Sequence, residues 1–212
     1  MLYVRIPKHI GIIPDGNRRF ATGQGLEKNE GYAHGLSPGV RAVKMAKKYG
    51  IEEVTFYGFT VDNCRRPVKQ VESFQKACVA AVELICAEND VEVLVVGDDS
   101  SAFFPDALRP YLTRQTVGEA EIKVNFLVNY GWKWDLKGID GGHVVKDLRS
   151  KEVTRMDMII RWGGMRRLSG FLPVQSVYSD FFVVDALWPD YEDQHMVDAI
   201  NWYQKQDVTL GG

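Results

Sequence analysis

Residues 15–19 read Asp-Gly-Asn-Arg-Arg and directly follow an apolar run, so one carboxylate and two guanidinium groups lie at the end of an expected strand. Gly16 lets the backbone turn and present N–H groups to an anion, as phosphate-binding turns do. Arg18 and Arg19 can donate charge-assisted hydrogen bonds to phosphate oxygens. Asp15 would repel a bare diphosphate, but it can bind Mg²⁺, which takes carboxylate and phosphate oxygens together. The turn predicts a magnesium-bridged diphosphate, although a plain type I turn with solvated arginines explains these residues equally well.

A second segment, residues 161–171, repeats this combination after another apolar run at 158–160. It reads Arg-Trp-Gly-Gly-Met-Arg-Arg-Leu-Ser-Gly-Phe and so combines glycines, arginines and a hydroxyl group. Two such segments in one chain favour the diphosphate interpretation over the plain turn.

Three segments of the chain resemble motifs of the cis-prenyltransferases, the undecaprenyl diphosphate synthase family. Residues 9–20 resemble H-I-x-I-I-x-D-G-N-x-R-W, residues 59–67 resemble F-S-x-E-N-W-x-R-P, and residues 161–171 resemble R-T-G-G-E-x-R-L-S-N-F. Shorter matches occur at 129–131, 178–182 and 187–191. Because the matches follow the family's order from about residue 8 onward, the chain is identified as a member of this family.

The resemblance implies a role for each matching residue on the side of the allylic donor. Asp15 would be the essential carboxylate and a metal ligand, and Asn63 and His34 would be catalytic, with His34 in contact with the donor diphosphate. The donor diphosphate would be bound by Gly16, Asn17, Arg18 and Arg19, with Phe20 beside them in place of a family tryptophan. Thr60, Asp62 and Arg66 are also expected to bind substrate.

On the acceptor side, the resemblance implies that Arg161, Arg167 and Ser169 clamp a second diphosphate. Asp180 stands where the family has a metal-binding glutamate, so it is expected to join Asp15 in binding Mg²⁺. The family also works as a homodimer whose C-terminal tail reaches the neighbouring site. A dimer is therefore expected here, although the tail at 208–212 keeps the family's glycines and lacks its arginine.

These roles imply how the reaction would proceed. Magnesium and fixed donors would stabilise the diphosphate that leaves the allylic carbon. The clamp would hold the acceptor double bond near the resulting cation, while apolar walls exclude water. The proton lost at the end could go to the released diphosphate, His34, Thr60 or Asp15, and the sequence does not choose among them.

The chain departs from the family pattern around the expected acceptor site. Trp162 and Met165 replace a threonine and a glutamate, and residues 132–157 are markedly fewer than in the family. We therefore expect a short C10 product from irregular condensation and cyclisation of two dimethylallyl diphosphates, as in lavandulyl or cyclolavandulyl diphosphate synthases. The alternatives are head-to-tail condensation with isopentenyl diphosphate to a short Z-prenyl diphosphate, or a non-catalytic partner subunit.

Composition bounds the class of protein. The 212 residues are 45% hydrophobic and 25% charged, which suits one α/β domain over residues 1–212. A net charge of −2 provides no general attraction for nucleic acid. Three cysteines are too few and wrongly spaced for a zinc site, and their odd number disfavours a disulfide framework, so a cytoplasmic protein is expected. No apolar run approaches the roughly 20 residues of a transmembrane helix, and no signal pattern precedes His9.

Alternating apolar segments predict the elements that must position these residues. Strands are expected at 10–14, 54–59, 91–96, 122–128, 158–160 and 181–187, several of them continuously apolar as buried parallel strands are. Ser37 and Pro38 predict a helix start that Gly50 ends, and helices are also expected near 71–85 and 196–203. The pattern predicts a mostly parallel central sheet flanked by helices. Because the carboxyl ends of parallel strands share one edge, the three motif segments should converge there.

Overall fold

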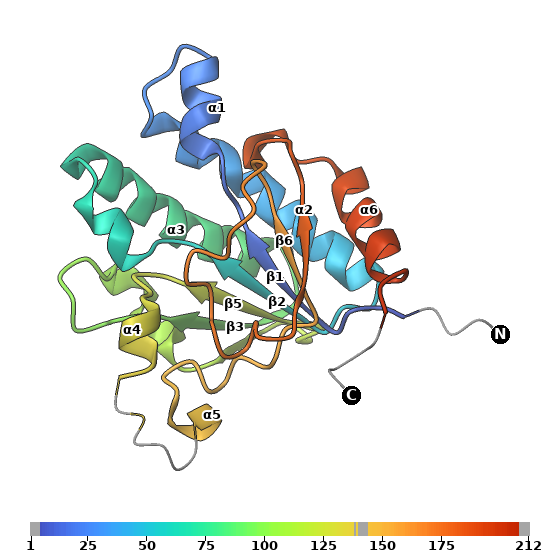
Figure 1. The fold of residues 1–212 in the computed structure, drawn as a ribbon. Coiled ribbons are helices and arrows are strands. Elements are labelled where there is room, and N and C mark those ends of the chain that lie inside the picture. The colour runs from blue at the N-terminus through green and yellow to red at the C-terminus, as the bar shows by residue number, and fades with distance from the viewer. Residues whose placement is uncertain (1–4, 138, 140–143, 208–212) are drawn as a thin grey trace.

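The structure is a computed structural model that describes residues 5–137, 139 and 144–207. Within them lies one sheet of seven strands in the order β4-β3-β5-β2-β1-β6-β7 (Figure 1). All neighbours pair in parallel except β3 and β4. The strands are β1 His9–Ile13, β2 Glu53–Tyr57, β3 Val91–Val96, β4 Gln115–Val117, β5 Ile122–Leu127, β6 Met158–Arg161 and β7 Asp180–Val183. The predicted α/β fold with a mostly parallel sheet is confirmed.

Each predicted strand is present. Most of the strand ends differ from the predicted ends, by one to four residues. The sequence missed β4, because its three residues, Gln115–Val117, are mostly exposed and carry no continuous apolar signal. The expected strand at 181–187 is shorter than predicted, since β7 ends at Val183.

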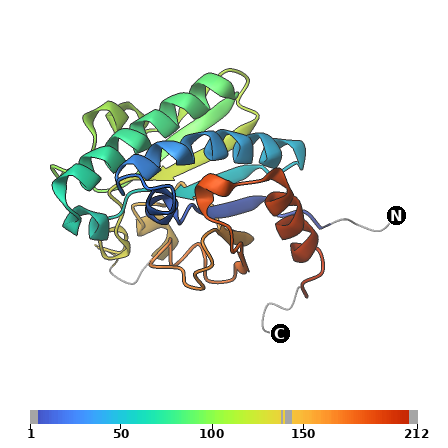
Figure 2. The same cartoon turned by 90° about the horizontal axis from the view of Figure 1, so that it is seen from above.

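One face of the sheet is covered by three helices that lie side by side (Figure 2). They are α2 Leu36–Lys48, α3 Val68–Glu88 and α6 Asp193–Tyr203. Ile10 and Ile12 of β1 pack into this layer, together with alternate residues of the neighbouring strands. Alternate side chains of each strand are therefore buried under the helices, and the remaining side chains face the opposite side of the sheet.

The start of α2 differs from the prediction. The helix begins at Leu36, and Gly35 is its N-cap, so Ser37 is not the capping residue and lies in the first turn with Pro38. Proline is tolerated there because first-turn N–H groups lack helical partners. The predicted end is confirmed, since Gly50 follows the helix with a left-handed φ of +74°.

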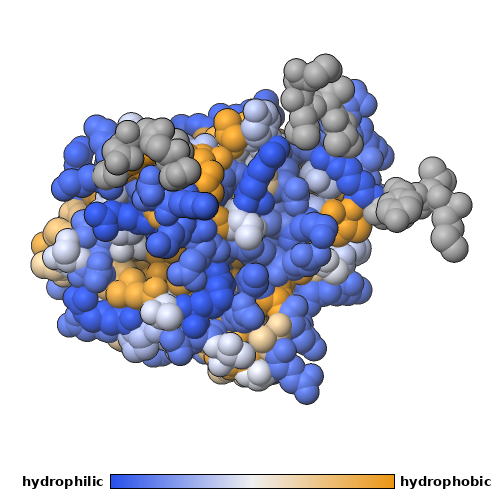
Figure 3. Space-filling model, turned by 90° about the horizontal axis from the view of Figure 1, so that it is seen from below, coloured by the Kyte–Doolittle hydropathy of each residue, from blue (hydrophilic) through white to orange (hydrophobic). Residues whose placement is uncertain are grey.

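The opposite face carries two short helices, α4 Trp132–Asp135 and α5 Val144–Asp147, and the irregular segment that follows them. Gly11 shows how closely this layer packs, because a Cβ there would lie 2.5 Å from the Phe171 ring and 2.7 Å from Met156 Sδ. Seen from below, the surface is mainly hydrophilic with separate hydrophobic areas (Figure 3). Among the described residues, no helix is long and apolar enough to cross a membrane.

Short helical segments occupy several of the connections. The helix α1 Asn17–Gly23 follows β1, and the 3-10 helices are η1 Glu30–Gly35, η2 Val61–Arg65, η3 Asp106–Leu112 and η4 Trp188–Asp190. Two of them, α1 and η2, begin just after the carboxyl ends of the neighbouring strands β1 and β2. The motif segments therefore leave the sheet at the same edge, as the sequence predicted.

Candidate active site

A cavity of about 600 Å³ opens at the carboxyl ends of β1, β2 and β6. It brings together residues that are far apart in the sequence. The predicted site residues that line it are Asp15, Gly16, Asn17, Arg18, Arg19, Thr60, Asp62, Asn63, Arg66, Arg161, Arg167 and Ser169.

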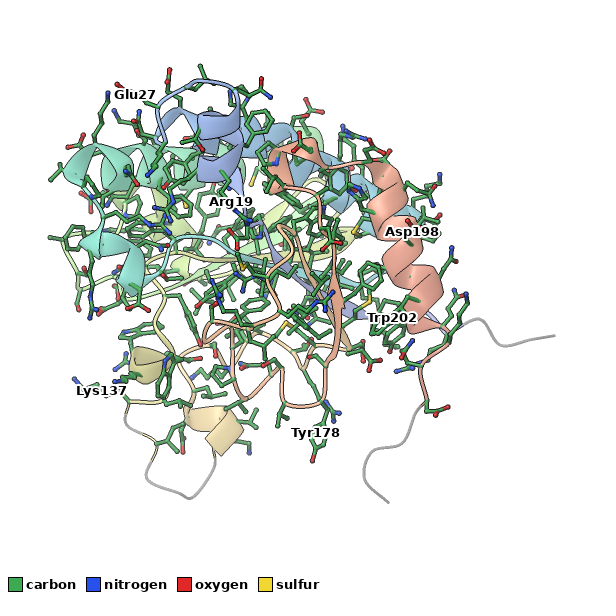
Figure 4. All side chains as sticks on the ribbon, turned by 45° about the horizontal axis from the view of Figure 1, so that its top comes forward. Arg19, Glu27, Lys137, Tyr178, Asp198 and Trp202 are labelled. Carbon is green, nitrogen blue, oxygen red and sulfur yellow. The ribbon has the colours of Figure 1, made fainter. Side chains whose placement is uncertain are left out.

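Asp15 and Arg161 form the centre of the cavity. Arg161 is the last residue of β6 and lies opposite Ile13 of β1. The ends of these two strands therefore bring the charged groups of Arg161 and Asp15 together. Arg161 Nη2 donates to Asp15 Oδ2 at 2.8 Å, and the guanidinium is almost completely buried. Arg19 Nη2 approaches the other carboxylate oxygen of Asp15 at 3.5 Å. Figure 4 shows Arg19 on the inner side of α1, directed toward the middle of the molecule.

The segment after β6 wraps around Arg161. Arg161 Nη1 donates to Ser169 Oγ at 3.1 Å and to the carbonyl oxygen of Arg167. Its Nε atom is buried without a partner among the described residues. A buried charged donor that lacks an acceptor is costly, so the contacts of the two other guanidinium nitrogens must hold Arg161 in place.

The turn after β1 is shaped by a left-handed glycine. Gly16 has a φ of +117° and stands at the start of α1, where a Cβ would lie 2.9 Å from the Leu187 side chain. Asn17 Nδ2 donates to the carbonyl oxygen of Pro14 at 3.1 Å, which ties the turn to the strand end. Arg18 and Arg19 then project from α1 with exposed side chains. This is a cationic wall that faces the cavity.

The segment after β2 contributes polar donors. Asn63 Oδ1 accepts from the backbone N–H of Thr60 at 2.9 Å, so the group that Asn63 can offer a ligand is its amide nitrogen. Arg66 Nη1 donates to the Tyr32 hydroxyl at 3.0 Å and its guanidinium lies 5.6 Å from the Phe74 ring centre. These contacts hold Arg66 at the cavity wall.

Sequence reasoning missed several residues that line the same cavity. Tyr57 falls in the strand expected at 54–59 and Phe74 in the helix expected near 71–85, whereas Tyr32 and Lys28 were given no role. A tyrosine at the last position of a strand that leads into a polar motif is a signal that would have found Tyr57.

Phe20 and His34 lie beside the cavity and do not line it. Their rings lie against each other with centroids 5.1 Å apart, and His34 is exposed. The structure therefore does not bring His34 to the position expected for contact with the donor diphosphate. Both residues belong to η1, which buries Tyr32 and leaves His34 on its exposed side.

Asp180 lies at the other edge of the sheet. It is the first residue of β7 and pairs with Met158 at the amino end of β6. Asp15 follows β1, whose last residue pairs with Arg161 at the carboxyl end of β6. The length of β6, roughly 10 Å for four strand residues, therefore separates the two levels of the sheet. Asp180 instead faces Arg5, at 3.5 Å. The prediction that Asp180 shares a metal with Asp15 is therefore wrong for a single chain.

Trp162 also differs from expectation. Because neighbouring strand residues point to opposite faces, Trp162 turns away from the cavity while Arg161 enters it. It is fully buried in the helical layer, 4.8 Å from the Trp188 ring and 5.7 Å from the Tyr191 ring. The expectation that Trp162 reshapes the acceptor pocket is wrong, whereas Met165 does line the cavity.

Charge in the cavity favours anions. Six cationic side chains line it against two carboxylates, those of Asp15 and Asp62; the cations are Arg18, Arg19, Lys28, Arg66, Arg161 and Arg167. No group of three or more potential metal ligands of the His, Cys, Asp or Glu type occurs in the described part of the chain. Asp15 fits Mg²⁺ nonetheless, since this ion is usually held by one or two carboxylates together with phosphate oxygens and water.

A second, apolar cavity of about 80 Å³ adjoins the first. Pro14, Asn17, Tyr32, Gly58 and Phe74 line both cavities. The apolar one continues between the sheet and the helices α2 and α3, where it is lined by Phe56, Cys78, Ala81, Ile85, Phe126 and Trp188. The two cavities thus place an anion-binding space next to an apolar one.

The fold and these two cavities define an α/β protein that can bind an amphiphilic phosphorylated ligand at its strand ends. The family model described as putative undecaprenyl diphosphate synthase matches residues 13–211. The chain belongs to this family of prenyltransferases.

Curated relatives agree. The ditrans,polycis-undecaprenyl-diphosphate synthases of Photorhabdus laumondii and Escherichia coli K12, both named as specific for (2E,6E)-farnesyl diphosphate, are each 29% identical to the chain. The matches cover 98% and 97% of this chain and 90% of each relative. An isoprenyl transferase of Thermus thermophilus is 29% identical over 97% of this chain and 89% of its own length.

A solved structure has the same fold. Lavandulyl diphosphate synthase from Lavandula x intermedia, crystallised with dimethylallyl diphosphate, matches with a TM-score of 0.82. The match covers 98% of this chain and 99% of the other, at 20% sequence identity.

Proposed function

We propose that this chain is a magnesium-dependent synthase that joins two dimethylallyl diphosphates into a C10 product. The observation that carries the proposal is the position of a small apolar cavity directly beside a large cationic one, with five residues lining both. The six cationic side chains of the large cavity are enough for more than one diphosphate. The small cavity limits the length of the hydrocarbon.

The size of the apolar cavity supports a short product. Its volume of about 80 Å³ is roughly half of the ~150 Å³ cavity that holds benzene in an engineered protein core. Such a space is far too small for a polyprenyl chain and takes only a few carbon atoms. Phe56, Phe126 and Trp188 wall it, with Phe56 and Phe126 stacked at 5.4 Å.

The residues would act as follows. Arg18 and Arg19 would bind the donor diphosphate, while Arg161, Arg167 and Ser169 would bind the acceptor diphosphate. Preorganised donors of this kind stabilise charge that develops on a leaving group. Bound at Asp15, Mg²⁺ would supply further positive charge to the diphosphate. The apolar walls formed by Tyr32 and Phe74 would keep water from the allylic cation.

The proton that leaves at the end has fewer candidate acceptors than the sequence suggested. His34 does not line the cavity, whereas Thr60 and Asp15 do. The released diphosphate, Thr60 and Asp15 therefore remain as candidate acceptors.

The irregular coupling rests on Met165, which lines the cavity where the family motif has glutamate. An apolar side chain beside the acceptor clamp favours the methyl groups of a dimethylallyl acceptor. The names of the undecaprenyl relatives favour the second candidate, head-to-tail condensation of isopentenyl diphosphate with an allylic diphosphate to a short Z-product.

The deciding experiment compares products formed from dimethylallyl diphosphate alone with those formed when isopentenyl diphosphate is added. Mass spectrometry and NMR of the dephosphorylated product identify the connectivity. A branched or cyclic C10 alcohol from dimethylallyl diphosphate alone is expected. Because apolar contacts separate C5 isomers by only about 1–3 kcal/mol, minor incorporation of isopentenyl diphosphate is also expected. A linear Z-product that requires isopentenyl diphosphate would select the second candidate, and no product under either condition would indicate a non-catalytic subunit.

We also propose that the chain acts in the cytoplasm as a homodimer. The edge strand β7, whose residues are only half-buried, supports an interface on that side. Sedimentation equilibrium of the purified chain tests the dimer, and loss of turnover in EDTA with recovery in Mg²⁺ tests the metal requirement.

A further inference from the structure

The loop that carries the acceptor clamp has an unusual backbone. Besides its glycines, two residues with a Cβ adopt left-handed conformations, Ser169 with a φ of +55° and Leu172 with a φ of +39°. This region is unfavourable for such residues, and it persists only where surrounding contacts enforce it. Something outside the loop must therefore hold these two positions.

A tyrosine hydroxyl meets the backbone at the first of these positions, Ser169. Tyr57 Oη donates to the carbonyl oxygen of Ser169 at 2.7 Å. The neighbouring tyrosine, Tyr130, donates to Asp135 Oδ2 at 2.8 Å. The two tyrosine rings meet edge to face with centroids 6.2 Å apart.

Tyr57 is the one of the pair that reaches the cavity. It is the last residue of β2, and its ring stacks on Phe171 of the loop with centroids 4.8 Å apart. Burial, and then the Asp62 carboxylate, raise the pKa of Tyr57, so its hydroxyl keeps its proton and acts as a donor. This hydroxyl therefore serves to hold the loop and not to accept a proton.

The held conformation matters for the clamp. Ser169 Oγ and the carbonyl oxygen of Arg167 both accept from the same Arg161 nitrogen, which orders the three clamp residues around one buried guanidinium. If Ser169 relaxed to a right-handed conformation, its carbonyl and hydroxyl groups would change direction and this arrangement would be lost.

We propose that Tyr57 is a positioning residue for the anion-binding loop, because its hydroxyl holds Ser169 in the left-handed conformation that directs the clamp into the cavity. Only the identity of the anion, a diphosphate, rests on the proposed function. The conformational role of Tyr57 stands on the geometry of the loop alone.

The experiment places Tyr57→Phe in three backgrounds: the parent chain, Ser169→Ala and Ser169→Gly. Alanine removes the hydroxyl of Ser169 and keeps the backbone strain, whereas glycine removes both, because it adopts positive φ readily. Phenylalanine keeps the stack on Phe171, so the fold should be retained, and thermal unfolding checks this.

Two readouts are combined. Amide hydrogen exchange of residues 167–172 should speed up about three- to tenfold on Tyr57→Phe in the parent and in Ser169→Ala, and less than about twofold in Ser169→Gly. Affinity for inorganic diphosphate in magnesium buffer, measured by calorimetry, should fall by a similar factor in the first two backgrounds only. The loss of diphosphate affinity in Arg167→Ala measures how much the clamp contributes to this binding.

Tyr178→Phe is the matched control, since Tyr178 is exposed and lies over Arg155 outside the cavity. An equal effect of Tyr57→Phe in all three backgrounds, or no change of exchange in the parent, would overturn the positioning role. If the parent binds no inorganic diphosphate while exchange follows the expected pattern, the proposed function fails and the role of Tyr57 stands.

Discussion

Arg161 and Asp15 form an ion pair of 2.8 Å in which the Arg161 side chain is only 5% exposed and the carboxylate faces a cavity. Arg19 approaches the second oxygen of Asp15 at 3.5 Å. Both oxygens that a metal would use are therefore engaged by arginines. A diphosphate would compete for these same arginines, since charge-assisted bonds to phosphate are among their strongest.

The first prediction is that diphosphate and divalent metal bind cooperatively. Mn²⁺ alone should bind weakly to the parent chain, measured by electron paramagnetic resonance, and inorganic diphosphate should strengthen it. Arg161→Gln should raise the affinity for Mn²⁺ alone roughly tenfold or more, because a bond to a charged group is lost. Arg167→Gln is the control, since Arg167 lines the cavity without a salt bridge to Asp15. Equal Mn²⁺ affinity in the parent and Arg161→Gln would contradict the coupling.

The second prediction separates the two roles of Asp15. Asp15→Ala should lower turnover on the order of 10²–10³-fold or more. It should also destabilise the fold by about 3–5 kcal/mol, because it leaves the buried Arg161 charge unpaired. Removal of the Asp15 carboxylate therefore affects the fold as well as turnover.

Asp15→Asn keeps an oxygen acceptor for Arg161 and should recover part of the stability without recovering turnover. Urea unfolding and steady-state rates measure the two effects. Turnover of Asp15→Asn within a few-fold of the parent would remove Asp15 from the metal site.

The third prediction distinguishes the two diphosphate positions. Arg167→Ala should raise the concentration of acceptor needed for half-maximal rate by roughly tenfold or more, since each such bond contributes about 1.5–3 kcal/mol. Arg18→Ala should do the same for the donor. Arg167 is a cleaner choice than Arg161, which also binds Asp15. Donor and acceptor can be varied separately in the minor reaction of dimethylallyl diphosphate with isopentenyl diphosphate, so its initial rates measure each dependence. Equal weakening of both by either variant would reject two separate positions.

Much of this site could be predicted because its chemistry follows the sheet. Asp15, Thr60 and Arg161 each stand at or just after the carboxyl end of a parallel strand, so strand order alone brings them together. A residue's place in a motif does not say which way its side chain points. Trp162 follows Arg161 in the motif, yet strand alternation sends it to the other face.

Other residues could not be predicted for reasons of distance and packing. Tyr57 acts on a loop 112 residues away through one hydroxyl, which no local pattern reveals. Asp180 matched a metal-binding position of the family, but the parallel pairing of β6 and β7 puts it at the amino edge. The expected role of the tail at 208–212 lies outside the described residues.

The fourth prediction concerns pH. His9 is buried at the start of β1, with Nε2 2.8 Å from Thr55 Oγ1 and 3.9 Å from Glu53 Oε1. Burial lowers the pKa of His9 despite the nearby carboxylates of Glu53 and Asp157, which oppose the shift. The unfolded chain then binds a proton more readily than the folded one. The stability present above about pH 6.5 should be lost as pH falls toward the lower folded pKa.

Urea unfolding at pH 8, 6.5 and 5.5 measures this dependence. His9→Gln cannot titrate at this position, so its stability should fall less steeply between pH 6.5 and 5.5 than that of the parent. His34→Gln is the control, since His34 is exposed. Identical slopes for the parent and His9→Gln would show that another group governs the acid sensitivity.

The fifth prediction tests whether the apolar cavity sets product length. Ile85 of α3 lines this cavity and Ile200 of α6 does not, although both are 1% exposed. Alanine at either position should cost about 2–5 kcal/mol of stability, because each removes buried methyl groups. Only Ile85→Ala enlarges the space available to the hydrocarbon, so only this variant should accept geranyl diphosphate more readily and form products longer than C10. Mass spectrometry of the dephosphorylated products compares the two at equal folded fraction. Unchanged lengths in Ile85→Ala, or the same lengthening in Ile200→Ala, would place the growing chain outside this cavity.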